Sequence, residues 1–242
     1  MDLGLGGKRA AVAASSQGLG RATAAALAAE GVTVAICGRS RERIDAAAAE
    51  IPGSIPLVAD VGTEDGAASF VQAATAALGG IDILVANGGG PPAGTFASTD
   101  LAAYRTAIEQ NCLSVIAMCA EAVPAMQAQG WGRVLAITSI SVRQPIATLI
   151  LSNTARAGLT GFLKTLAREV GADGVTVNSI QPGTHDTERI RALHGAGTDL
   201  SGGAIGRPED FGRVAAFLCS DAARFVNGAA LNVDGGAYAG LQ

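Results

Sequence analysis

The feature that most constrains the fold is a regular alternation of short apolar runs with longer, alanine-rich segments. Seven runs of strand length recur along the chain, at residues 8–15, 32–38, 54–60, 82–87, 132–139, 174–182 and 229–236. Segments of helical length separate them, at 18–30, 40–50, 63–78, 99–129, 147–171 and 207–220. Strands that are apolar on both faces and joined by helix-length crossovers form a parallel sheet covered on both sides. The pattern predicts a doubly wound α/β fold with a seven-stranded parallel sheet.

Composition favours a single folded domain. The chain has 242 residues, of which 49% are hydrophobic and 16% charged, so it can bury a large core. Neither a composition break nor an internal repeat marks a second unit. We therefore expect one domain over 1–242. The polar, glycine-containing segment 184–206 is predicted to form a substrate lid.

Charge and residue usage argue against several classes of partner. The formal net charge is −4 and the pI is about 5.2, so no basic face is expected for nucleic acid. No uncharged apolar run approaches the ~20 residues needed to cross a bilayer, and the first residues lack a signal-peptide pattern. We expect a cytoplasmic protein that acts on a small molecule. The four cysteines stand far apart with no histidine cluster nearby, which predicts buried thiols and no metal site.

A glycine-containing turn follows the first predicted strand, in the sequence AASSQGLGRATAAALAAEG. Gly18 and Gly20 stand where a helix begins, so bare backbone N–H groups and the helix dipole can face a pyrophosphate. Because the turn joins the first strand to the first helix of a βαβ unit, it favours a dinucleotide site. The residues expected to contact the dinucleotide here are Ala14, Ser15, Ser16, Gly18, Leu19 and Gly20.

The end of the second predicted strand, ICGRS, carries no acidic residue that could bind the adenosine ribose hydroxyls. It offers Cys37, Gly38 and Arg39 instead. A cation at this position suits a 2′-phosphate, so NADP(H) is favoured over NAD(H) as cofactor. The alternative is that Arg39 is a solvated residue at the start of a helix.

With these features the chain resembles the short-chain dehydrogenase/reductase family over essentially its whole length. The family's glycine turn, T-G-x-x-x-G-x-G, falls on Ala13, Ala14, Gly18 and Gly20, so alanines replace the first threonine and the first glycine. The second replacement adds a methyl group where backbone and cofactor approach closely. The resemblance implies a Rossmann-type nucleotide-binding domain that holds a nicotinamide cofactor.

Two further family motifs lie in the first half of the chain. The resemblance implies that Asp60 contacts the adenine amino group, with Val61 beside the ring. The run ANGG at 86–89 stands where the family reads N-N-A-G and keeps Asn87 and Gly89, which implies that Asn87 and Gly88 contact the cofactor. Each residue has a structural alternative, since Asp60 could cap the helix beginning near Thr63 and Asn87 could satisfy a turn.

Three motifs follow in the second half. The resemblance implies that Asn111 holds a water in a proton relay, although a buried asparagine could also simply bond a carbonyl. Pro182, Gly183 and Thr187 match the segment that grips the nicotinamide carboxamide. The run NVDGG at 232–236 matches the closing strand and its turn.

The catalytic positions of the family are only partly retained. Its active site has a serine, a tyrosine thirteen residues later and a lysine four residues after that, with the tyrosine as acid or base. These positions fall on Ser139, Ser152 and Arg156. A serine hydroxyl has no useful acidity near neutral pH, and arginine stays protonated. Ser139 can still bind a substrate oxygen, and Arg156 can bind the nicotinamide ribose or an anionic group.

Other side chains could replace the missing acid. His185, in QPGTHDT, is predicted near the nicotinamide and has a suitable unperturbed pKa, so it is a candidate proton donor. The two tyrosines are weaker candidates. Tyr104 precedes Asn111 by two helical turns and is interpreted mainly as a packing residue, while Tyr238 lies in the C-terminal tail.

Three functions remain open. The first is NADP(H)-dependent reduction of a carbonyl, of the 3-oxoacyl or ketone type. The second is a non-redox reaction on the same fold, catalysed by an isomerase, dehydratase or cyclase. The third is the sensing of NADP(H) without turnover. The resemblance further implies a homotetramer, or a dimer, that pairs through 99–129 and 147–171 and through the last strand and helix.

Overall fold

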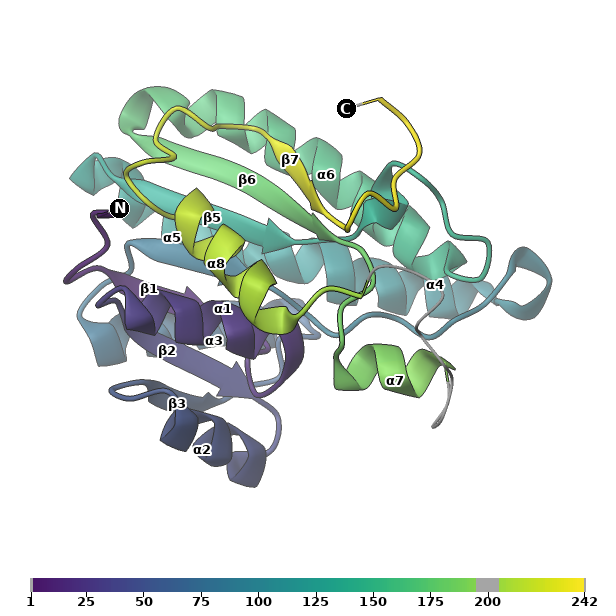
Figure 1. The fold of residues 1–242 in the computed structure, drawn as a ribbon, viewed down its shortest axis with the longest axis horizontal. Coiled ribbons are helices and arrows are strands. Elements are labelled where there is room, and N and C mark those ends of the chain that lie inside the picture. Colours follow the sequence, from purple (N-terminus) through teal and green to yellow (C-terminus); the bar gives the residue numbers. More distant parts are fainter. Residues whose placement is uncertain (1, 195–204, 242) are drawn as a thin grey trace.

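The sheet has seven parallel strands, as the apolar runs predicted. The computed structural model describes residues 2–194 and 205–241. Its strands are β1 (Arg9–Val12), β2 (Thr33–Gly38), β3 (Ile55–Val58), β4 (Ile83–Ala86), β5 (Gly132–Ile137), β6 (Val175–Pro182) and β7 (Ala230–Val233). They pair in the order β3-β2-β1-β4-β5-β6-β7 (Figure 1). The chain reverses its direction of travel across the sheet between β1 and β4, which is where open α/β sheets bind ligands.

Helices cover both faces of the sheet and bury two apolar cores. One face carries α1 (Gly18–Ala29), α2 (Arg41–Glu50) and α8 (Pro208–Leu218); the other carries α3 (Glu64–Leu78), α5 (Ser114–Gln129) and α6 (Ile150–Val170). Side chains of each strand alternate between the cores. In β1, Ala10 and Val12 face α1, whereas Ala11 faces α3. This arrangement confirms the doubly wound fold.

The segment predicted as one helix, 99–129, is interrupted. Its first part, α4 (Leu101–Ile108), passes through a π-helical turn, η2 (Glu109–Leu113), before α5 begins. The predicted helix is therefore present from Leu101 to Gln129, and its π-turn is a feature that the sequence did not predict. A π-turn adds one residue to a helical turn, which hydrophobic periodicity does not reveal, and such turns are frequent at functional sites.

The stretch Leu101–Gln129 is long and apolar enough to cross a membrane by length and composition alone, with a mean hydropathy of 1.2. Its residues Met118, Ala122 and Met126 are buried in the core beneath the sheet. Packing within the domain accounts for its apolar character.

The polar segment after β6 contains a short helix, α7 (Glu188–His194). The Thr187 hydroxyl caps it by accepting a hydrogen bond from the Ile190 N–H at 3.3 Å. Asp186 instead pairs with Arg191 at 2.8 Å. Of the predicted lid, 184–206, residues 195–204 lie outside the described part of the chain.

Candidate active site

The turn between β1 and α1 is held in an unusual backbone conformation. Ala14 has a φ of +45° and is the one non-glycine residue with positive φ in the described chain. Such a conformation costs an L-residue roughly 1–2 kcal/mol, and it stands where the family has a glycine. Gly18 has a φ of +59°, so this position needs its glycine.

Neighbouring strand ends support the strained turn. The Ala14 N–H donates to Cys37 Sγ at 3.3 Å, and the Asn87 side-chain amide donates to the Ala14 carbonyl at 3.1 Å. Ser15 is fully buried, and its hydroxyl donates to the Val12 carbonyl at 2.7 Å and accepts from the Cys37 N–H at 3.0 Å. Asn87 and Ser15 therefore position the turn within the protein.

Close contacts also fix the start of α1. A Cβ atom at Gly20 would lie 2.6 Å from the Ala14 carbonyl oxygen and 2.7 Å from Asn87 Nδ2, so no larger residue fits. A Cβ at Gly18 would lie 3.6 Å from the Thr187 side chain. The glycine turn and the start of the 187–194 region therefore face each other, as a site shared by one cofactor requires.

The adenosine end of the predicted site lies beyond β2 and β3. Arg39 is exposed directly after β2 and forms no ion pair with a described residue. Asp60 is exposed and accepts a hydrogen bond from the Gly62 N–H at 3.0 Å, while Val61 is buried. The α3 helix is capped by Thr63, which accepts from Gly66 N–H at 3.1 Å. The alternative in which Asp60 caps this helix is therefore excluded.

The catalytic positions of the family converge at the carboxyl end of β5. Ser139 follows this strand, and its hydroxyl accepts a hydrogen bond from the Ser141 N–H at 3.1 Å. Arg156, from α6, donates through Nη1 to the carbonyls of Ile137 and Thr138 at 2.9 and 3.2 Å. Ser152 lies one helical turn before Arg156 and is also buried. The guanidinium is thus placed beside the strand end that carries Ser139.

Arg156 is a buried cation without a described counterion. The residue is only 8% exposed, and no carboxylate of residues 2–194 or 205–241 forms an ion pair with it. Burial, together with the nearby positive charge of Arg189, lowers the pKa of Arg156 to about 10. The group therefore remains charged at neutral pH.

Arg189, on α7, is a site residue that the sequence patterns missed. Its Nη2 atom donates to the carbonyl of Pro91, in the loop after β4. Its guanidinium also occupies the space next to Gly90, where a Cβ would lie 2.8 Å from Nη2. Arg189 is exposed, and the sequence of a polar segment offers no signal that this arginine, among several, contacts the loop after β4.

Gln181 is a second residue that the patterns missed. It is fully buried on β6, and neither atom of its amide has a hydrogen-bond partner in the described chain. The Thr138 N–H donates to the Ile180 carbonyl, which extends the β5–β6 register and sets Thr138 opposite Gln181. By the alternation of β6, Gln181 faces the same side of the sheet as Val177, which is the side covered by α6.

Asn111 occupies the π-turn, as a buried residue 3% exposed. Its Nδ2 donates to the Ala107 carbonyl at 3.3 Å, whereas its Oδ1 is buried without a described partner. The structural alternative, a buried amide that bonds a carbonyl, therefore explains Asn111 Nδ2. It does not explain Oδ1, which can still accept a hydrogen bond.

The other candidate acids make contacts of their own. The His185 ring packs edge-on against Phe211 of α8, with centroids 5.2 Å apart, and its Nδ1 is 3.3 Å from the Gly183 carbonyl. Tyr104 packs against the small apolar cluster between α4 and α6. Tyr238 belongs to the tail, where a Cβ at Gly240 would meet its hydroxyl at 2.6 Å. The rings of His185 and Tyr104 therefore have packing roles.

The segment QPGTHDT is anchored to the last strand. The Gly183 N–H donates to the Val233 carbonyl at 3.0 Å, and a Cβ at Gly183 would lie 2.7 Å from Asp234 Cα. This close approach requires glycine at 183. It places Pro182 and Thr187 at the same sheet edge as the glycine turn.

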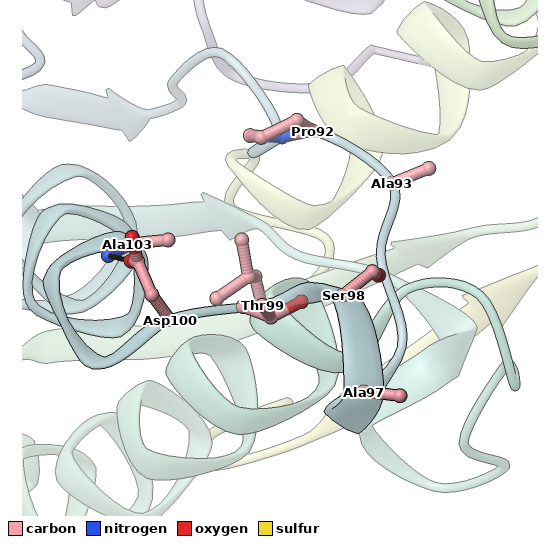
Figure 2. A pocket seen from close by; sticks show the side chains of 8 residues that line it. Pro92, Ala93, Ala97, Ser98, Thr99, Asp100 and Ala103 are labelled. Atoms are coloured by element: carbon pink, nitrogen blue, oxygen red, sulfur yellow. Dashed lines mark hydrogen bonds between the residues drawn. The ribbon is translucent and has the colours of Figure 1, made fainter.

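A pocket of about 430 Å³ opens beside α6. Figure 2 shows its wall, built by the loop after β4, by the short helix η1 (Phe96–Ser98) and by the start of α4. Leu151, the neighbour of Ser152, completes the lining. The loop is tied to the segment before α6, because Gly94 N–H donates to the Thr148 carbonyl at 2.7 Å. This hydrogen bond joins the loop after β4 to the loop between Ser139 and Ser152.

Comparison with known proteins identifies the family. The family model described as enoyl-(acyl carrier protein) reductase matches residues 13–238. The 3-oxoacyl-acyl-carrier-protein reductase FabG of Aquifex aeolicus is 31% identical over 250 residues, covering 98% of this chain and 100% of the relative. The chain belongs to the short-chain dehydrogenase/reductase family.

Solved structures of short-chain dehydrogenases/reductases share the whole fold. L-sorbose reductase from Gluconobacter frateurii, complexed with NADPH and L-sorbose, superposes with a TM-score of 0.93 at 30% identity over 100% of both chains. A 7α-hydroxysteroid dehydrogenase complexed with NADH has a TM-score of 0.90 at 26% identity, over 100% of this chain and 98% of the other. The chain thus has the fold that holds a nicotinamide cofactor in these two relatives.

Proposed function

We propose that the protein is an NADP(H)-dependent reductase of a carbonyl group that relies on the charge of Arg156, with no acidic tyrosine at position 152. The observation that carries this proposal is the charged, buried guanidinium beside Ser139 at the end of β5. A fixed positive charge in a water-poor site stabilises the negative charge that develops on a carbonyl oxygen during reduction.

The residues present fit a dinucleotide. The glycine turn has the open backbone that a pyrophosphate needs, since Gly18 takes up a positive φ. A Cβ at Gly89 would meet nothing within 4 Å, which leaves room beside Asn87 and Gly88. We assign the pyrophosphate to Ala14, Ser16, Gly18, Leu19 and Gly20, and the nicotinamide half to Asn87, Gly88, Pro182, Gly183 and Thr187.

The preference for NADP(H) rests on Arg39. One of the two solved relatives carries NADPH and the other NADH, so the family fold alone does not select the cofactor. An exposed cation directly after β2, without a described counterion, suits a 2′-phosphate. Asp60 and Val61 would then border the adenine.

The chemistry divides between the cofactor and the chain. When bound, the reduced nicotinamide supplies the hydride to the carbonyl carbon. Ser139 donates a hydrogen bond to the carbonyl oxygen, and Arg156 stabilises the alkoxide that forms. A proton from water, held at the free acceptor of Asn111, completes the alcohol. Ser152 lines the site without acting as an acid, and His185 is left out because its ring is packed against Phe211.

Two measurements test this function. Titration of the protein fluorescence with NADPH and NADH measures cofactor binding, and NADPH absorbance follows turnover with a panel of ketones and aldehydes. Reduction of any carbonyl supports the proposal. Tight NADPH binding without turnover would instead indicate a sensor, and absence of nucleotide binding would reject both functions.

A converted site provides a further comparison. The double variant Ser152→Tyr, Arg156→Lys restores the family's acid and its partner. If the rest of the machinery is intact, this variant should reduce ketones faster than the natural chain does. A converted protein that binds NADPH but gains no activity would show that the remaining site is not built for reduction.

A further inference from the structure

The charge of Arg156 has no counterion among the described residues although the side chain is buried. Its Nη1 atom donates to two carbonyls, whereas Nη2 and Nε make no hydrogen bond to a described residue. A buried charge is costly unless it is paired, and removing water from a guanidinium leaves several donors to satisfy. The fold thus maintains a cation that a ligand can complement.

A second guanidinium lies at the end of the neighbouring strand, since β4 pairs with β5. Arg189 reaches toward the same sheet edge from α7, and its position beside Gly90 and the Pro91 carbonyl holds it against the loop after β4. Its charge is near enough to Arg156 to depress the pKa of that residue. Two like charges repel, so an anion between them relieves the repulsion and pairs with both.

We propose that the substrate is an oxo acid whose carboxylate binds between Arg156 and Arg189. This inference rests on the proposed carbonyl reduction and names its substrate class. The planar guanidinium fork matches the two oxygens of a carboxylate. Arg156 is hydrogen-bonded to the end of β5, which also carries Ser139. In the substrate, the carboxylate carbon and the reacting carbonyl carbon must therefore be only a few covalent bonds apart. A 2-oxo or 3-oxo acid has that geometry.

The location also separates this anion from the cofactor phosphates. The glycine turn lies at the end of β1, and Arg39 lies after β2, on the opposite side of β1 from β5. Arg156 instead bonds the end of β5, and Arg189 bonds the loop after β4, the strand next to β5. The pocket of Figure 2 adjoins this point through Leu151 and can take the remainder of the substrate.

Paired substrates test the inference. NADPH oxidation is measured with phenylglyoxylate and its methyl ester, and with acetoacetate and its ethyl ester. Each pair keeps the reacting carbonyl and removes only the negative charge. We expect kcat/KM for at least one acid to exceed that of its ester by about 10- to 100-fold, as charge-assisted bonds contribute. Equal rates for acid and ester in both pairs would overturn the inference.

Variants assign the effect to the arginine pair. Arg189→Ala should raise KM for the acid by about 10-fold or more while leaving the ester and NADPH affinity unchanged. Arg191→Ala is the matched control, because Arg191 lies on the same helix and pairs with Asp186 at its exposed surface. If the two variants behave alike, Arg189 does not bind the carboxylate.

A binding measurement keeps this inference separate from the proposed function. Oxalate, a dicarboxylate that is not reduced, is titrated calorimetrically into the protein and into Arg189→Ala. Binding that the variant weakens supports the anion site even if no carbonyl is reduced. Reduction of neutral ketones without oxalate binding would leave the proposed function standing and reject the anion site.

Discussion

Arg156 is buried and has no described counterion, so its replacement should change the stability of the protein as well as its activity. Arg156→Met removes an unpaired buried cation and keeps an unbranched side chain, so we expect the free energy of unfolding to rise by about 1–3 kcal/mol while carbonyl reduction is lost. Urea denaturation measures the first effect. Arg133→Met is the matched control, because Arg133 is equally buried but pairs with Asp221 at 3.2 Å. The control variant should lose stability. A similar loss in Arg156→Met would contradict the assignment of Arg156 as a buried cation without a counterion.

Arg39 provides a second prediction for a single residue. Arg39→Glu exchanges the cation expected at the 2′-phosphate for a carboxylate that suits ribose hydroxyls. NADPH affinity should fall by about 10-fold or more, and NADH affinity should change far less. Fluorescence titration with both cofactors checks the ratio. Arg41→Glu is the control, since that exposed arginine pairs with Asp45 one turn into α2. An unchanged NADPH affinity would show that Arg39 is a solvated surface residue.

Among the elements, the start of α1 depends on close packing against the ends of β1 and β4. Gly20→Ala places a methyl group against the Ala14 carbonyl and the Asn87 amide. Overpacking of this kind costs about 1–3 kcal/mol of stability, and the displaced turn should also bind NADPH more weakly. Thermal unfolding and cofactor titration measure the two effects. Gly6→Ala is the control, because a Cβ there meets nothing within 4 Å and the residue has no positive φ. Equal behaviour of the two variants would argue against the contact.

For the whole molecule, the pH dependence of stability should carry a signature of His185. Burial lowers the pKa of this histidine, although its contact with the Gly183 carbonyl opposes the shift. The unfolded chain therefore binds a proton at a pH where the folded chain does not. Stability should fall as the pH drops below about 6.5, by up to ~1.4 kcal/mol per pH unit until the folded-state pKa is passed. Urea denaturation between pH 5.5 and 7.5 should show a smaller slope in His185→Gln, and an unchanged slope would rule out this source.

The exposed surface of α6 bears on assembly. Ala157, Gly158 and Gly161 are exposed there, and a Cβ at either glycine would meet nothing within 4 Å. Small residues permit close helix packing, so we propose a homo-oligomer, a tetramer or a dimer, that pairs through this helix. Gly161→Arg should lower the molar mass measured by light scattering after gel filtration. A natural chain that elutes as a monomer would contradict the proposal directly.

Much of the framework follows from local patterns in the sequence. The apolar runs of the central strands became strands because their residues serve both cores at once, as Ala10 and Ala11 do in β1. Gly18 marks the turn because its positive φ is a requirement of the backbone alone. The π-turn at Asn111 escaped prediction because one added residue leaves the apolar pattern of the helix intact.

The sequence by itself determined the fold class, the glycine turn and the absence of a tyrosine and a lysine at 152 and 156. Only the tertiary structure decided that Arg156 is enclosed without a described carboxylate, that Arg189 lies near it, and that His185 is directed against Phe211. Strands and turns depend on the residues next to them in the chain. The electrostatics of a buried charge depend on which distant residues the fold brings around it.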